Sequence, residues 1–239
     1  MLVLLAAPPA AAYRPFISTD AAVAAPQEME IELGYFSVER SNRANTFTMP
    51  SVVLNYGVAK NWEAVGEFRL QVSPSVQVAD PSLSLKGVLR EGILQEKPGP
   101  SIAVEVGPLL PSTLPNEGHF GFEGIGIISA GLGPFTFHIN GGGGIDRVDA
   151  RAFGIWGVIG EFPVVQSFRI VGEIAGEDVR GELPNHAALI GFIWQAAPSV
   201  AVDAGLRRGL TDGAPAWQIT AGVTFGFRVP WAPRPASTD

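Results

Sequence analysis

Few residues of this chain have types and spacings that support catalysis, and His138 and Asn140 are the best placed. They lie two residues apart in "FTFHIN", so on an extended strand they share one face. A histidine activates a serine or cysteine placed beside it, but asparagine is no nucleophile. The chain has no cysteine, and it contains no G-x-S-x-G or H-E-x-x-H pattern. We therefore predict no enzymatic activity and no catalytic residue, and we interpret His138 as a hydrated polar side chain.

Metal and cofactor sites are equally weakly indicated. His119, His138 and His186 are far apart in the sequence, and a zinc site needs three or four ligands close together. The glycine run at residues 141–144 is no phosphate loop, because no Lys-Ser/Thr follows it. We predict neither a metal nor a cofactor, and interpret the run as a thin patch of wall.

The composition indicates an exported protein with an unusual surface. Of 239 residues only 16% are charged, against about 25% in ordinary soluble domains, so part of the surface does not meet water. The net charge of −7 argues against a nucleic-acid partner. The start, "MLVLLAAPPAAAYRP", is typical of a secretory signal peptide, over residues 1–12. No later apolar run reaches the roughly 18 residues of a spanning helix, so a membrane would be crossed by strands.

Strand periodicity dominates the rest of the chain. At residues 62–72 the even positions are apolar or small, while Glu63, Glu67 and Arg69 occupy odd ones. Similar stretches, together with weaker ones between them, give about twelve strands of about ten residues. Short connections alternate with longer polar ones, except that "EGILQEKPGP" is long where a short turn is expected.

This pattern predicts an all-β fold, a closed up-and-down antiparallel transmembrane β-barrel. The domain division is an N-terminal segment at 13–27, the barrel at 28–227 and a C-terminal tail at 228–239. Because backbone groups in hydrocarbon must all be paired, the last strand, "AWQITAGVTFGF", must close the barrel against the first. Its end resembles the signal that the assembly machinery of outer-membrane barrels recognises.

Alternation alone fits a soluble barrel as well as a membrane barrel. The secretory start, the low charge and aromatic residues near strand ends favour apolar faces that meet lipid, with charges inside. The predicted lipid-facing residues of the closing strand are Trp217, Ile219, Val223, Phe225 and Phe227. The predicted lumen-facing residues are Glu28, Glu30, Glu32, Glu63, Glu67, Arg69, Lys86, Arg90, Glu105, His138, Asn140, Arg169, Glu173, Asp203 and Arg207.

Two questions about this lumen stay open in the sequence. Side chains of both signs lie on neighbouring strands, so cross-strand ion pairs are expected; they would either fill and brace a narrow lumen or line a polar path. The acidic residues Glu28, Glu30 and Glu32 are either a wall that attracts cations near one mouth or a solvated face.

Several stretches, in order, resemble one known family. They include "EMEIELGYF", "VVLNYGVAKNWEAVGEF", "PSIAVEVGPLLPS", "FTFHINGGGGIDR", "VAVDAGLRRGL" and "TAGVTFGF". They are similar to the outer-membrane proteins assigned to the MetA pathway of phenol degradation, often called transporters. The resemblance implies a barrel of about twelve strands in the bacterial outer membrane that passes small solutes, hydrophobic or aromatic ones among them, and it transfers no catalytic residue.

We therefore predict an outer-membrane channel. The alternatives are a closed structural or adhesin-like barrel with a plugged interior, and a soluble exported barrel that binds a ligand in the manner of a lipocalin. The predicted partners are outer-membrane lipid, a small-molecule solute and, during biogenesis, the barrel-assembly machinery.

Overall fold

The computed structural model describes residues 14–41 and 44–229, and the predicted signal peptide and residues 230–239 of the predicted tail lie outside them. Within these residues the chain forms twelve strands and one 3-10 turn, η1 (Ile93–Gln95). No helix among them is long and apolar enough to span a membrane. The strands are β1 (Glu28–Ser41), β2 (Ala44–Ala59), β3 (Trp62–Ser73), β4 (Gln77–Arg90), β5 (Ser101–Leu109), β6 (Gly121–Leu132), β7 (Phe135–Ile145), β8 (Ala152–Val165), β9 (Phe168–Val179), β10 (Asn185–Ala197), β11 (Val200–Gly209) and β12 (Trp217–Arg228).

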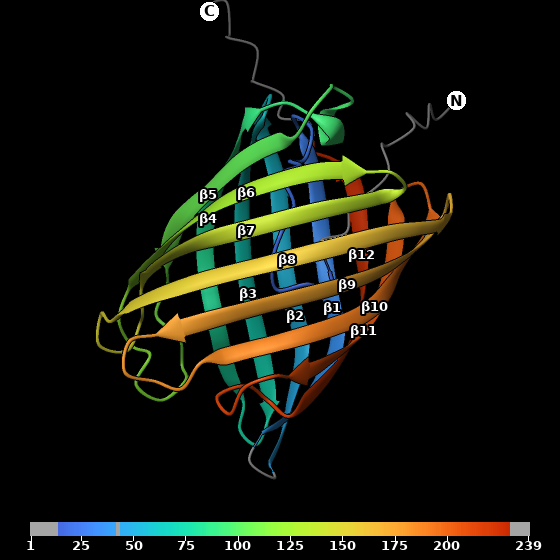
Figure 1. The fold of residues 1–239 in the computed structure, drawn as a ribbon. Coiled ribbons are helices and arrows are strands. Elements are labelled where there is room, and N and C mark those ends of the chain that lie inside the picture. The colour runs from blue at the N-terminus through green and yellow to red at the C-terminus, as the bar shows by residue number, and fades with distance from the viewer. Residues whose placement is uncertain (1–13, 42–43, 230–239) are drawn as a thin grey trace, which may run out of the picture.

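All twelve strands join into one closed antiparallel barrel (Figure 1). Each strand pairs with its neighbours in sequence, and β12 pairs with β1 from Glu28↔Arg228 to Arg40↔Trp217. Closure leaves no strand edge, which is the condition for a sheet to cross hydrocarbon with its backbone groups paired. The predicted fold is confirmed, including the closing role of the last strand.

The two ends of the barrel differ in their connections. Glu28 and Arg228 lie at the end that we call the turn end, where the links are residues 60–61, 91–100, 133–134, 166–167 and 198–199. The described connections at the opposite loop end are residues 74–76, 110–120, 146–151, 180–184 and 210–216. Barrels of this kind carry short turns on the periplasmic side and longer loops outside. One connection at the loop end, residues 74–76, is short, because β4 begins at Gln77.

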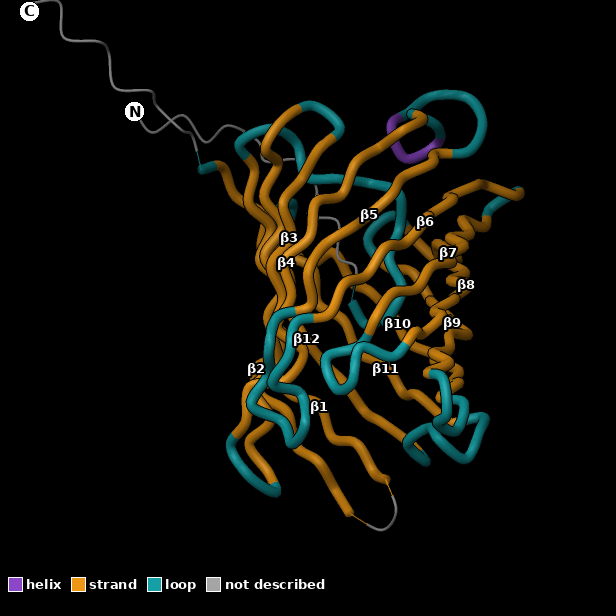
Figure 2. Tube along the Cα trace, turned by 90° about the vertical axis from the view of Figure 1, so that its left-hand side faces the viewer, coloured by secondary structure: helices purple, strands orange, loops and turns teal. Residues whose placement is uncertain are grey.

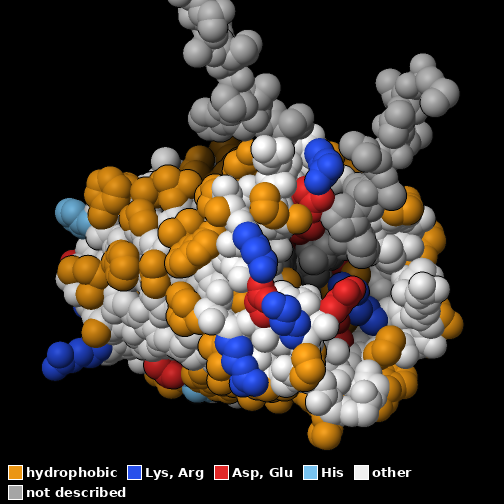
Figure 3. All heavy atoms as spheres, turned by 90° about the horizontal axis from the view of Figure 1, so that it is seen from above, with side chains coloured by type: hydrophobic (Ala, Val, Ile, Leu, Met, Phe, Trp, Pro, Cys, Tyr) orange, Lys and Arg blue, Asp and Glu red, His pale blue; other side chains and the backbone are white. Residues whose placement is uncertain are grey.

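Alternation along the strands sends apolar side chains outward. Large hydrophobic residues around the girth are exposed; among them are Leu85, Val106, Ile128, Ile139, Val158, Ile174, Ile190, Leu206 and Ile219. In a view onto the turn end, hydrophobic side chains cover much of the visible flank of the barrel, and charged side chains gather around the mouth (Figure 3). A continuous apolar belt outside a closed sheet is the surface that lipid requires.

Register shifts change which residues face inward. A bulge in β1 between Gly34 and Phe36 switches the parity, so Glu39 turns to the inside and pairs with Gln218. A second bulge, in β4, leaves Arg90 exposed and paired with Ile102, on the outward set. The prediction that Arg90 faces the lumen is therefore wrong, because simple alternation does not anticipate an extra residue.

Candidate functional site in the barrel lumen

The barrel interior is occupied by residues 14–27, which we call the luminal segment. It forms no regular secondary structure, so its backbone needs partners elsewhere. The Glu173 carboxylate of β9 accepts hydrogen bonds from the backbone N–H groups of Ile17 (3.0 Å) and Ser18 (2.8 Å). Asn140 of β7 both accepts from the Thr19 N–H (3.0 Å) and donates to the Thr19 carbonyl (2.7 Å). Inward polar side chains thus take the place of a strand partner.

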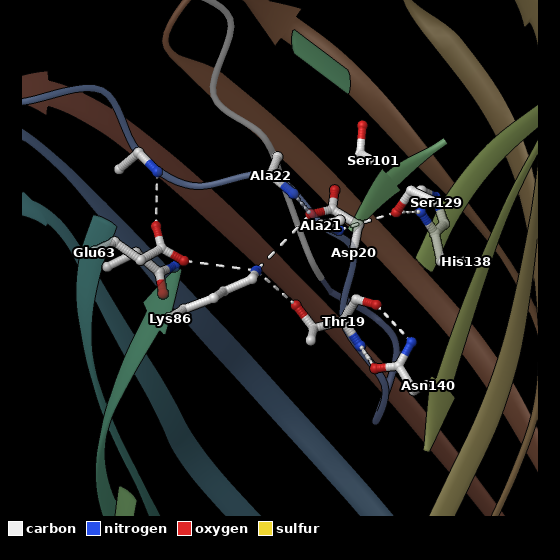
Figure 4. A network of polar contacts seen from close by, with 12 residues as sticks. Thr19, Asp20, Ala21, Ala22, Glu63, Lys86, Ser101, Ser129, His138 and Asn140 are labelled. Atoms are coloured by element: carbon white, nitrogen blue, oxygen red, sulfur yellow. Dashed lines mark hydrogen bonds and ion pairs between the residues drawn. The ribbon is translucent and has the colours of Figure 1, made fainter. Parts of the chain in front are cut away.

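A serine and a histidine hold the middle of the segment. Ser129 of β6 accepts a hydrogen bond from the Ala21 N–H (2.9 Å), and its hydroxyl lies 2.8 Å from His138 Nδ1 (Figure 4). His138 Nε2 in turn lies 3.8 Å from the Glu161 carboxylate. His138 is only 2% exposed, so the expectation that it is hydrated is wrong, because the luminal segment excludes water from this part of the wall.

Serine, histidine and glutamate in this order resemble a hydrolase triad in composition. Ser129 is fully buried, however, and its hydroxyl is already bonded to the luminal segment. A substrate carbonyl has no access to that hydroxyl, so the arrangement as it stands clamps the segment. Among the described residues, no group of three His, Cys, Asp or Glu side chains has the geometry to hold a metal ion.

Lys86 is the centre of a buried ion-pair cluster. It is 1% exposed, and its ammonium lies 3.6 Å from Glu63, 3.8 Å from Asp20 and 3.1 Å from the Thr19 hydroxyl (Figure 4). The second oxygen of Glu63 accepts from the Ala24 N–H at 2.7 Å. One cross-strand pair, from β3 and β4, therefore fixes two points of the segment at once.

Arg14 holds the inner end of the segment. Its guanidinium donates to Ser51 of β2 (2.8 Å) and Thr220 of β12 (2.6 Å), and it lies 3.6 Å from Asp203 of β11. Asp203 is 1% exposed. The pairing explains how that carboxylate is charge-compensated in the interior, since an uncompensated buried charge is costly.

Glycines on the inner wall make room for the segment. A Cβ added at Gly34 would meet the Ser51 hydroxyl at 1.8 Å and Arg14 at 2.6 Å, and one added at Gly157 would meet the Ser18 hydroxyl at 1.9 Å. Side chains at these positions would collide with the bound segment. The inner wall is thus shaped to the segment as well as bonded to it.

The unexpectedly long connection at the turn end is also part of this arrangement. Residues 91–100 include η1, which is visible at the turn end in Figure 2, and Gln95 donates to the Ala21 carbonyl at 3.0 Å. Leu94 packs against the cluster of Ala21, Ala103 and Ile127. The length of this turn, exceptional in the sequence, serves to cover the luminal segment.

Between the segment and the loop end lies a cavity of about 630 Å³, which we call the vestibule. Ile17 and Ser18 border it on the segment side, and Asp146, Arg151 and Glu182 border it in the loops. Burial alone would raise the pKa of Asp146, but hydrogen bonds from the Arg151 and Asp149 backbone and from the Arg151 side chain lower it below its usual value. Because the vestibule reaches from the loops down to Ile17 and Ser18, the lumen is open from the loop end to the segment.

The vestibule carries an excess of negative charge. Its arginines are engaged in ion pairs, namely Arg69–Asp80, Arg147–Asp80, Arg151–Asp146, Arg151–Glu182 and Arg207–Glu173. Four of its carboxylates have no hydrogen bond or ion pair within the described part of the chain: Glu39, Glu67, Glu123 and Glu177. A field of this sign attracts cations and repels anions.

The remaining predicted lumen residues are distributed as follows. Glu28, Glu30 and Glu32 are at most 8% exposed, so the interpretation of this set as a solvated face is wrong. Glu32 accepts from Asn55 at 2.9 Å. Glu105 is half-buried beside Lys86, its register partner, and Arg169 lies 3.2 Å from Glu161. On the closing strand, Ile219, Phe225 and Phe227 are exposed, while Trp217 and Val223 are half-buried.

Sequence reasoning missed residues of three kinds. Glu39 is hidden by the bulge, and Glu123 lies in a stretch with a less regular pattern. Glu177 lies beyond the end of the clear alternation that includes Glu173. Arg14 lies in the segment to which no structure was assigned. The available signal was the glycines at inward positions, such as Gly157 and Gly222, which indicate close contact with another part of the chain.

No known family model matches the chain, and no curated protein matches it in sequence. Among solved structures, the NanC porin superposes with a TM-score of 0.60 over 82% of this chain and 98% of that chain, at 10% identity. The CymD monoaromatic hydrocarbon channel gives 0.49 over 86% and 90%, at 9% identity. Omp33 of Acinetobacter baumannii gives 0.43 over 84% and 97%, at 13% identity.

The likeness to the NanC porin concerns the fold alone, and it is the fold of an outer-membrane barrel. A closed barrel with a continuous apolar belt and a polar interior is a protein of the bacterial outer membrane. The resemblance to the proteins of the phenol-degradation pathway stays a prediction.

Proposed function

We propose that the protein is an outer-membrane channel for small solutes, hydrophobic or aromatic ones among them, and that the luminal segment closes it at rest. The observation that carries the proposal is a vestibule that is open toward the loop end and stops at Ile17 and Ser18. Its wall contains charged residues and also apolar ones, such as Ile125, Phe153 and Ile155. Such a lining suits a small solute with an apolar part and a polar group. No covalent chemistry is proposed.

The second candidate is a closed structural barrel, and the luminal segment itself favours it. Residues Arg14 to Ala24 fill the turn-end part of the lumen and are hydrogen-bonded to eight strands of the wall. In that case the segment stays in the lumen permanently, and the protein either stabilises the membrane mechanically or presents its loops at the cell surface for adhesion. The two candidates differ in one observable property, which is whether the segment can be displaced.

A reversible cross-link tests displacement. The Cβ of Ser18 lies 3.1 Å from a Cβ built at Gly157, close to the roughly 3.5–4.5 Å of a disulfide. The chain has no cysteine, so Ser18→Cys/Gly157→Cys has only one disulfide to form. We expect the oxidised protein to be silent in planar bilayers. The reduced protein should show conductance steps at least as often as the wild type, because a free cysteine at position 157 crowds the segment.

The control places two cysteines on the outer face at the register pair Val158 and Ile174. Oxidation of this pair should leave the conductance unchanged. Conductance of the oxidised Ser18–Gly157 variant at the reduced level would refute a closing role for the segment. Silence of the wild type and of both reduced variants at every voltage would instead support the closed structural barrel.

A further inference from the structure

The outer face of the barrel carries a tryptophan with an arginine on each side of it. Arg40 of β1 and Arg208 of β11 are both register partners of Trp217 on β12, between them. Since Glu39 and Arg207 face inward, their neighbours Arg40 and Arg208 face outward on the same level. Directly opposed residues on one face lie about 4.5–5.5 Å apart at Cβ. The three side chains therefore form one row, which we call the Arg-Trp-Arg row.

The row lies at the level of the outer membrane interface. Trp217 is the first residue of β12 after the loop 210–216, and Ser41 ends β1 directly beyond Arg40. Tryptophan concentrates where hydrocarbon meets head groups. Because the loop end carries the longer connections, this interface belongs to the outer leaflet.

The two arginines have no acidic partner. Arg208 donates to the Ala216 carbonyl at 2.8 Å and Arg40 to the Asn45 amide oxygen at 3.3 Å, and neither forms an ion pair with a described residue. Every arginine of the vestibule, in contrast, is paired with a carboxylate. Arg208 is exposed and Arg40 half-buried, so guanidinium donors remain for an external acceptor.

Nearby acidic residues reduce the positive charge of the two arginines but do not cancel it. Asp178 and His186, on the adjacent rim of β9 and β10, are bonded to each other at 3.1 Å. Asp212, in the loop before Trp217, is exposed and forms no ion pair within the described residues. The chain as a whole carries a charge of −7, so a cationic row at the lipid surface is a local reversal of its charge.

We propose that Arg40, Trp217 and Arg208 bind a phosphate of a phosphorylated glycolipid in the outer leaflet. Guanidinium groups match phosphate oxygens in bidentate geometry, and the indole between them packs against the acyl-chain boundary. Cationic side chains beside a membrane span are the common means of holding anionic head groups. The site fixes the barrel in the outer leaflet at the β11–β12–β1 seam, where the sheet closes.

Native mass spectrometry of the full chain in detergent tests the site, with diphosphoryl lipid A as the probe. The wild type should retain the lipid, and Arg40→Gln/Arg208→Gln should weaken retention by about tenfold for each arginine removed. The matched control, Arg90→Gln/Arg228→Gln, removes two arginines from the turn end and should bind like the wild type. Heat-modifiable gel migration checks that each variant is folded.

Three outcomes would overturn the proposal. The first is equal loss of lipid in the variant and its control, which would show only a nonspecific charge effect. The second is equal retention of lipid A after its phosphates are removed. The third is complete displacement by millimolar inorganic phosphate, which would show an anion site with no commitment to lipid.

Discussion

Removal of the Lys86 ammonium should destabilise the barrel far more than removal of an exposed lysine. Lys86 is 1% exposed, and it compensates Glu63, which is fully buried, at 3.6 Å. In Lys86→Met the Glu63 charge is left in the interior without its cation, and loss of one partner from a buried pair costs about 3–5 kcal/mol. Asp20 adds little to this penalty, because its side chain is partly exposed and can be hydrated.

The matched control is Lys60→Met. Lys60 lies 3.1 Å from Glu91, but its side chain is 79% exposed, and such surface pairs contribute about 0–1 kcal/mol. The free energy of unfolding is measured by urea titration of the barrel folded in lipid vesicles, with the slope checked for constancy. Both substitutions remove the same atoms, so their difference reports burial of the charge.

A rescue variant separates charge from packing. Lys86→Met/Glu63→Gln removes the stranded carboxylate, and the glutamine oxygen still accepts from the Ala24 N–H. We expect the double variant to be less destabilised than Lys86→Met alone, with a residual cost of about 1 kcal/mol for each lost hydrogen bond. A cost below about 1 kcal/mol for Lys86→Met, or no recovery in the double variant, would refute the argument from buried charge.

Two further predictions concern the two faces of the sheet. Val223→Arg, outward in mid-strand, should cost about 2–4 kcal/mol by the same urea titration, whereas Ser82→Arg, inward and opposite Glu67, should cost clearly less; equal costs would contradict the assignment of faces. The open channel should prefer potassium over chloride in reversal-potential measurements, and Glu123→Gln/Glu177→Gln should move that potential toward zero, most visibly at low ionic strength. Preference for chloride would contradict the charge balance of the vestibule.

Much of the architecture is predictable from the sequence because two rules act on every strand alike. Period two separates Lys86 and Glu63 from their apolar neighbours, and a membrane sheet has to close. These rules predict the strand number, the pairing of β12 with β1 and inward positions such as Glu173. They fail at Arg90 and Glu39, where one extra residue reverses the faces, because a bulge leaves no mark in the hydrophobic pattern.

The luminal segment is the part that sequence patterns do not predict. "RPFISTDAAVAAPQ" has no periodicity, and its partners, such as Glu173 and Asn140, are more than a hundred residues away along the chain. Its position follows from inward polar groups that need partners and from glycines that leave space. Neither condition can be recognised from the sequence alone, because the closed barrel determines which inward groups lack partners and which glycines lie next to the segment.

How the segment is held bears on whether it can move. Several of its bonds to the wall run from backbone N–H groups of Ile17 to Ala24 to carboxylate, amide or hydroxyl oxygens. Others run from the side chains of Arg14, Lys86 and Gln95. Each such bond contributes about 0.5–1.5 kcal/mol net, or about 1.5–3 kcal/mol where the acceptor is a carboxylate, and water can replace it once the segment has left the wall. Apolar burial is limited, with Phe16 packed on one small cluster and Ala21 in another. A segment held by exchangeable hydrogen bonds is suited to reversible displacement, whereas a permanent plug would be expected to bury a larger apolar surface.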